Sequence, residues 1–156
     1  MRAVVTRVSR AQVMVESEVV GEIGAGLLVL AGIAPPDNEQ VARHLAGRLA
    51  SLRIFADSQG RMNRSLLDVG GEVLLVSQFT LFADTSRGHR PSFLAAAPPD
   101  QGRRLCGELA EAMRALGVSR VAEGRFGAHM EVASVNDGPV TIVVSSGESS
   151  WETGCG

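Results

Sequence analysis

Four short apolar runs occupy the first 33 residues of the chain and constrain its fold more than any other feature. Each run is rich in valine or leucine, and polar residues or glycines separate one run from the next, as is typical of neighbouring β-strands. The predicted strands are residues 3–8, 11–15, 19–23 and 27–33. The last run is almost entirely apolar, which predicts a central strand that is buried on both faces.

Two amphipathic helices are predicted further along the chain. The first begins where Asp37 and Gln40 resemble a capping box. Its apolar residues recur at helical spacing and are Val41, Leu45, Leu49 and Leu52. The second helix begins after the proline pair at 98–99 and ends at Gly117. Its apolar residues are Leu105, Leu109, Ala112 and Leu116.

Further strand-like runs follow each helix, at residues 53–55, 72–77, 118–123, 130–135 and 140–145. The order of strands, helix, strands, helix and strands predicts a single α+β domain. We expect two main helices and a sheet that curls into a partial barrel. We assign this domain to residues 1–146. The Gly/Ser/Glu-rich residues 147–156 are expected to form a disordered tail.

The composition excludes several classes of function. The formal net charge is −2, so the chain is not a general binder of polyanions. Cys106 and Cys155 are interpreted as free thiols in a reducing compartment. No motif has the spacing of metal ligands, so we expect no metal and no cofactor. No apolar run is long enough to cross a bilayer, and the N-terminus does not resemble a signal peptide, which predicts a cytoplasmic protein.

The first candidate motif is residues 77–81, where Ser77, Gln78 and Thr80 end an apolar strand. These polar groups either cap the strand and organise a turn, or line a pocket in which backbone N–H groups face a developing oxyanion. Thr80 could act as a nucleophile only with a base nearby. No local spacing connects any of the three histidines to it.

The second candidate motif is residues 136–141, which begin with Asn136 and contain the pair Gly138 and Pro139. These residue types predict a hairpin loop between two strands. Alternatively, the glycine and proline expose a rigid backbone whose carbonyl groups could gauge the shape of a ligand. The two motifs are about 60 residues apart, so only folding or dimerisation can bring them together.

Over residues 1–146 the chain resembles the D-aminoacyl-tRNA deacylases. The pieces that carry this resemblance are residues 1–5, 7–11, 62–63, 65–71, 77–81, 90–93, 124–127 and 136–141. The resemblance implies a homodimer with a barrel-like α+β fold. It also implies hydrolysis of the ester that joins a D-amino acid to the terminal ribose of tRNA. The implied partner is therefore the aminoacylated 3′ end of tRNA, with no DNA and no membrane.

The resemblance also implies roles for eight residues. The pocket would be lined by the catalytic residues Ser77, Gln78, Phe79 and Thr80. Substrate contacts would come from Met130, Asn136, Gly138 and Pro139. The Gly138–Pro139 peptide, in cis, would enter the pocket of the partner subunit and reject L-amino acids. A mechanism led by the 2′-hydroxyl of the tRNA fits the sequence better than attack by Thr80.

A gauge that excludes an L side chain cannot exclude glycine, so we expect glycine mischarged on tRNA(Ala) to be released as well. Two other classes of function are kept as alternatives. One is a module that binds RNA or nucleotides without catalysis. The other is a hydrolase of small D-amino-acid esters in which Thr80 is the nucleophile.

Overall fold

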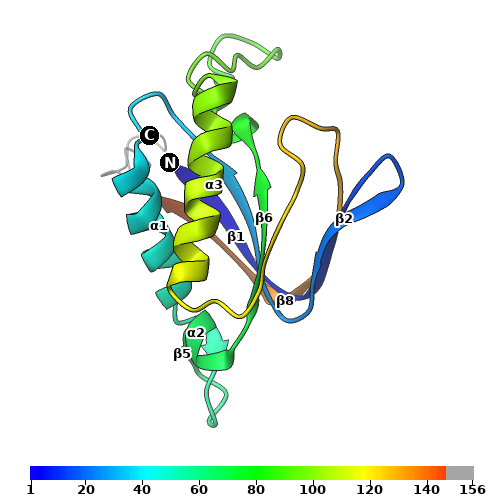
Figure 1. Ribbon diagram of the computed structural model, residues 1–156, viewed down its shortest axis with the longest axis vertical. Coiled ribbons are helices and arrows are strands. Elements are labelled where there is room, and N and C mark those ends of the chain that lie inside the picture. Colours follow the sequence, from blue (N-terminus) through cyan, green and yellow to red (C-terminus); the bar gives the residue numbers. More distant parts are fainter. Residues whose placement is uncertain (147–156) are drawn as a thin grey trace.

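The computed structural model describes residues 1–146, and the predicted tail at 147–156 lies outside the described residues. The chain forms a mixed α+β fold in which a six-stranded sheet curls towards a barrel and two long helices lie side by side on one of its faces (Figure 1). The predicted fold class is therefore confirmed. No helix within residues 1–146 is long and apolar enough to cross a membrane.

The sheet is built from β1 (Arg2–Val15), β2 (Glu18–Ile23), β3 (Gly26–Gly32), β6 (Glu72–Ser77), β7 (Val121–Glu123) and β8 (Glu131–Ser145). A separate ribbon pairs β4 (Phe55–Ala56) with β5 (Met62–Arg64). The helices are α1 (Glu39–Ser51), the short α2 (Leu66–Val69) and α3 (Pro99–Ala115). A 3₁₀ turn, η1 (Phe79–Phe82), follows β6 directly.

The sheet has the order β2-β1-β3-β6-β7, and β8 pairs with β1 along nearly its whole length. β3 and β6 are parallel, as are β6 and β7. The prediction of separate strands at 3–8 and 11–15 is wrong, because β1 is one strand of 14 residues. Its exposed residues Ser9 and Arg10 lie where β1 passes from pairing with β3 to pairing with β2.

The predicted hairpin at residues 136–139 is also wrong, because β8 continues through it as a single strand. Val8 of β1 lies opposite Asn136, and Thr6 lies opposite Thr141. The four residues 137–140 therefore lie opposite the single residue Arg7 and form a large β-bulge. The turn-forming residues break the regular ladder here without reversing the chain, because pairing with β1 resumes beyond them.

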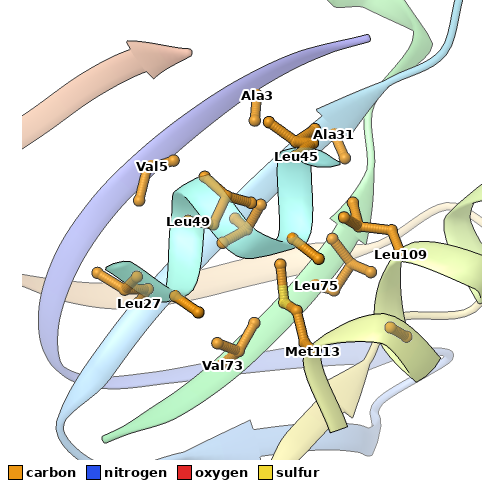
Figure 2. Packing of buried hydrophobic residues seen from close by; sticks show 14 of the residues in the cluster. Ala3, Val5, Leu27, Ala31, Leu45, Leu49, Val73, Leu75, Leu109 and Met113 are labelled. Carbon is orange, nitrogen blue, oxygen red and sulfur yellow. The ribbon is translucent and has the colours of Figure 1, made fainter. Parts of the chain in front are cut away.

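The main core lies between the sheet and the pair α1 and α3 (Figure 2). The predicted stripes supply Leu45 and Leu49 from α1 and Leu105 and Leu109 from α3, all of which are fully buried. Leu116 is instead 44% exposed, and Met113 fills the corresponding position of the core. Each fully buried leucine or methionine stabilises the fold by about 1.5–3 kcal/mol.

The start of α1 differs from the predicted capping box. Asn38 is the N-cap, and its Oδ1 accepts a hydrogen bond from the backbone N–H of Val41 at 3.1 Å. Asp37 is instead turned towards the first strand, where its carboxylate contacts the Met1 ammonium at 2.6 Å and accepts from the N–H of Ala34 at 2.7 Å. The predicted end of α3 at Gly117 is confirmed by the positive φ of 92° at this residue.

Candidate active site

The first motif lies where β6 ends and the chain turns into η1. The N–H of Gln78 donates to the carbonyl of Ala31 at 2.7 Å, which extends the pairing of β6 with β3 by one residue. The chain then bends sharply, because the N–H of Leu81 returns to the carbonyl of Gln78 at 3.2 Å. Gly32 makes this approach possible, since a Cβ atom there would lie 2.9 Å from the Gln78 oxygen.

A cavity of about 350 Å³ opens beside this bend, between the end of β6 and the first half of α3. Ser77 and Gln78 supply polar groups to its lining. Its walls are aromatic: Phe79 and Phe93 meet edge to face with centroids 5.0 Å apart, and Phe126 lines the cavity too. A small, mostly apolar cavity with a few polar groups is the usual form of a site for a small ligand or for the end of a larger one.

Cys106 on α3 also lines the cavity. This residue is buried, and burial raises the pKa of its thiol to about 11, with the charge of Glu123 contributing further. The thiol is therefore neutral at physiological pH and lacks the reactivity of a thiolate. Cys106 serves as an apolar wall and not as a nucleophile.

Thr80 is exposed and does not line the cavity. Its hydroxyl oxygen accepts a hydrogen bond from the side-chain amide Nε2 of Gln78. Within residues 1–146, this amide is its side-chain hydrogen-bond partner, and an amide is not a base. Among the described residues, no base is hydrogen-bonded to Thr80 and so placed to activate it as a nucleophile.

The second motif is held rigidly on the bulge of β8. The Gly138–Pro139 peptide is cis, as the resemblance implies, and Gly138 has a φ of 142°, which favours glycine. Asn136 closes the bulge from within, because its Oδ1 accepts from the N–H of Val140 at 3.0 Å and its Nδ2 donates to Thr141 Oγ1 at 3.1 Å.

Arg7 ties this bulge to the rest of the fold. Its Nε donates to the carbonyl of Asp137 at 2.9 Å, and its Nη1 donates to the carbonyl of Ile54 at the start of the β4–β5 ribbon. The side chain of Arg7 is only 14% exposed. The backbone on either side of Gly138 is therefore fixed by hydrogen bonds to Asn136 and Arg7. Gly138 and Pro139 themselves stay exposed.

The fold does not bring the two motifs together within one chain. On the sheet, Ser77 of β6 pairs with Ala31 of β3, which in turn pairs with Ala3 of β1. The bulge of β8 lies opposite Arg7, which is four residues beyond Ala3 on β1. The bulge is therefore four residues along the strands and three strands away from Ser77. With a rise of about 3.4 Å per residue and about 4.8 Å between strands, the path along the sheet from one motif to the other is about 20 Å. Met130 lies beside Gly124 and packs against the core cluster that contains Val76, the residue before Ser77.

Sequence reasoning missed the walls of the cavity that come from outside the first motif. Phe93, Gly102, Cys106 and Phe126 were given no role, because segments far apart in the chain supply them. One signal could have found the aromatic ones: Phe93 and Phe126 lie in residues 90–93 and 124–127, two of the pieces that carry the family resemblance. Within residues 1–146, no cluster of His, Cys, Asp or Glu could hold a metal ion.

Two solved structures share this fold. One, named c-Myc DNA Unwinding Element Binding Protein, is 38% identical, covers 93% of this chain and 98% of its own, and gives a TM-score of 0.87. The other, titled as a structural analysis of a probable eukaryotic D-amino acid tRNA deacylase, is 19% identical with a TM-score of 0.79. It covers 92% of this chain and 97% of its own, so it supports the fold alone.

The sequence comparisons are more specific. The model of the D-Tyr-tRNA(Tyr) deacylase family matches residues 4–145. The D-aminoacyl-tRNA deacylase of Deinococcus radiodurans is 61% identical over 144 residues, which are 92% of this chain and 99% of that protein. The D-aminoacyl-tRNA deacylase of Roseiflexus sp. (strain RS-1) is 62% identical over 146 residues, 94% of each chain.

The fold, the cavity and these matches together define an enzyme, a hydrolase that acts on carboxylic ester bonds. The chain belongs to the D-Tyr-tRNA(Tyr) deacylase family. The family predicted from the sequence is therefore confirmed.

Proposed function

We propose that this chain hydrolyses the ester bond between a D-amino acid and the 3′-terminal ribose of tRNA, and so releases free tRNA and the D-amino acid in the cytoplasm. The observation that carries this proposal is the cavity of about 350 Å³ beside Ser77 and Gln78. Membership of the deacylase family over residues 4–145 supports the same reaction. The substrate is already an activated ester, so the protein needs to position it and to stabilise negative charge.

The cavity suits the terminal adenosine of tRNA. Its walls include the rings of Phe93 and Phe126, and a base can pack against aromatic side chains with a gain of about 1–3 kcal/mol. Ser77 and Gln78 line the same cavity, and the ribose and the ester that follow the base would lie beside them. The first N–H groups of η1 receive no side-chain cap, and they can therefore donate to the oxyanion that forms at the ester carbon.

The reaction proceeds without a covalent intermediate on the protein. Water adds to the ester carbonyl carbon, the bond from this carbon to the ribose O3′ breaks, and the O3′ atom takes up a proton. Because Nε2 of Gln78 is already bonded to Thr80, its Oε1 is the atom that can accept from the ribose 2′-hydroxyl. The 2′-hydroxyl is thereby held beside the ester, where it assists the attacking water.

The active enzyme is a homodimer in which the bulge of one chain closes the cavity of the other. Gly138 and Pro139 lie about 20 Å from Ser77 along the sheet of their own chain. Residues 131–139 of β8 are all exposed, and the exposed apolar side chains Val132 and Val135 lie among them. Such a strand is a natural surface for a second copy of the chain.

The bulge then acts as the gauge of chirality. The carbonyl groups of Gly138 and Pro139 would hold the α-carbon of the substrate so that an L side chain clashes with the backbone. Rejection by a clash is specific without any contact to the D side chain, so many D-amino acids are accepted. Glycine has no side chain, and glycine mischarged on tRNA(Ala) is released too.

The alternatives are less well supported. A small-ester hydrolase with Thr80 as nucleophile needs a base, and the hydroxyl of Thr80 is bonded to an amide. DNA enters the name of one relative, but this chain has a net charge of −2, which does not favour DNA as a partner. A module that only binds RNA would show binding without turnover, and the following assay detects that outcome.

The test is deacylation of D-tyrosyl-tRNA and L-tyrosyl-tRNA by the purified protein, with a chelator present. Release from the D form alone is the expected result. Hydrolysis of both substrates would show that the bulge does not select for D-amino acids. Hydrolysis of neither would favour a protein that binds RNA without catalysis. Loss of activity with the chelator would show that a metal takes part.

A further inference from the structure

A cationic side chain is stacked on the wall of the cavity. The guanidinium carbon of Arg103 lies 4.9 Å from the centroid of the Phe126 ring. Phe126 lines the cavity, and so does Gly102, the residue that precedes Arg103 on α3. A Cβ atom at Gly102 would lie 3.2 Å from the Phe126 ring, so the glycine lets the ring sit close to the helix. Arg103 therefore stands at the rim of the cavity, on the outer side of the wall.

The guanidinium of Arg103 is available to a ligand. The residue is exposed, and within residues 1–146 it forms no ion pair. Its neighbour Arg104 is instead paired with Glu39, while Asp100, one turn earlier on α3, makes no ion pair with Arg103. Within residues 1–146 the guanidinium of Arg103 makes this contact with Phe126 and donates no hydrogen bond, so its N–H groups are available to a ligand.

The substrate supplies a partner of matching chemistry at this position. If the terminal base lies in the cavity against Phe126, the 5′-phosphate of the same nucleotide lies outside the rim. An arginine fork can bind a phosphate through two parallel hydrogen bonds. The chain carries a net charge of −2, so such a contact has to come from an individual arginine and not from a general positive field.

We infer that Arg103 is a phosphate-binding residue that positions the 3′ end of the tRNA. Its guanidinium, held in place by stacking on Phe126, binds the 5′-phosphate of the terminal nucleotide and so brings the ester to Ser77 and Gln78. This inference rests on the proposed function, because it takes the aminoacylated end of an RNA as the ligand. It assigns Arg103 to binding and not to the chemical step.

The test compares Arg103→Gln with Arg120→Gln. Arg120 is also exposed, and it precedes β7 at the end remote from the cavity, so both variants lose one surface charge. For D-tyrosyl-tRNA, Arg103→Gln should raise KM about tenfold and change kcat less than twofold. The slope of log KM against log salt concentration should fall by about 0.7, as expected for one lost contact to single-stranded phosphate. Arg120→Gln should match the wild type.

A second substrate, 3′-D-tyrosyl adenosine, carries the same ester without a phosphate. Arg103→Gln should hydrolyse it as well as the wild type does. An unchanged KM for D-tyrosyl-tRNA would overturn the inference. An equal rise in KM for both substrates would overturn it too, because Arg103 would then act only by holding Phe126.

The binding of a fluorescent RNA that ends in CCA separates this inference from the proposed function. Fluorescence anisotropy measures its Kd without any turnover. A wild-type protein that leaves D-tyrosyl-tRNA intact would refute the proposed function, yet a tenfold higher Kd for Arg103→Gln would still support the phosphate contact. Equal Kd values for the wild type and the variant would refute the contact whether or not the protein is catalytic.

Discussion

Arg7 offers the sharpest test of how the bulge of β8 is held. Replacing Arg7 with methionine keeps much of the buried volume but removes its hydrogen bonds to the carbonyls of Asp137 and Ile54. A hydrogen bond from a charged donor contributes about 1.5–3 kcal/mol. Water can replace the bond to the exposed Asp137, so we expect a total loss of about 3 kcal/mol.

Arg7 links the bulge to the backbone that precedes β4, so this loss loosens the bulge as well as that link. If about 3 kcal/mol separates the held bulge from looser arrangements, its removal makes the two equally populated, so the productive form falls from about 99% to about half of the molecules. We therefore expect kcat/KM for D-tyrosyl-tRNA to fall by about twofold in Arg7→Met. The rate of loss of aminoacyl-tRNA measures this directly, and urea denaturation measures the stability of the same sample.

Arg48→Gln is the matched control for this prediction. Arg48 also donates to β8, through a bond of 2.7 Å from its Nη1 to the carbonyl of Ser145, but it lies far from the bulge. Its loss should cost about 1 kcal/mol or less and leave kcat/KM unchanged. An Arg7→Met variant that is folded, destabilised and fully active would refute the claim that Arg7 fixes a catalytically important bulge.

Three further predictions concern the candidate site and the walls of its cavity. Thr80→Ala should keep at least a tenth of the wild-type kcat and form no acyl-enzyme, because no base activates its hydroxyl; a complete loss of turnover would contradict this. Gly102→Ala should gain up to about 1 kcal/mol of helix stability in urea denaturation. It should also raise KM, because its Cβ pushes the Phe126 ring into the cavity. The pKa of Cys106 is raised from 9.0 to about 11, so the unfolded state loses this proton first. The contribution of this thiol to stability is complete below pH 9 and is lost as the pH rises through 11. The free energy of unfolding should therefore fall by about 2–3 kcal/mol over this range. In Cys106→Ala the part of this fall that is due to the thiol should vanish.

The regular parts of the fold could be predicted from local pattern. β3 and β6 are continuous apolar runs, and their identity as buried central strands needs only their own residues. The bulge at 137–140 could not be predicted in the same way. Glycine and proline mark a break in the ladder, but whether the chain then reverses or continues depends on its pairing with β1, which begins about 130 residues earlier.

The candidate site was predictable to a similar extent. Ser77 and Gln78 stand out because polar side chains end an apolar strand, and the structure places both on the cavity. Phe93 and Phe126 became walls only through folding, because loops that follow η1 and β7 carry them to the same place. The path of about 20 Å along the sheet between the two motifs could not be seen in the sequence, since it follows from strand order and register.

Mixing two inactive variants tests the shared site most directly. Ala97→Phe fills the cavity, and Gly138→Ala disturbs the bulge, because a Cβ atom there would lie 2.9 Å from the backbone N of Val140. Each variant alone should be inactive on D-tyrosyl-tRNA. After unfolding and refolding together in equal amounts, half of the dimers should carry both variants, and each of these has one intact site. Cross-subunit closure therefore predicts about a quarter of the wild-type activity in the mixture, and a mixture that stays inactive while dimers form would contradict it.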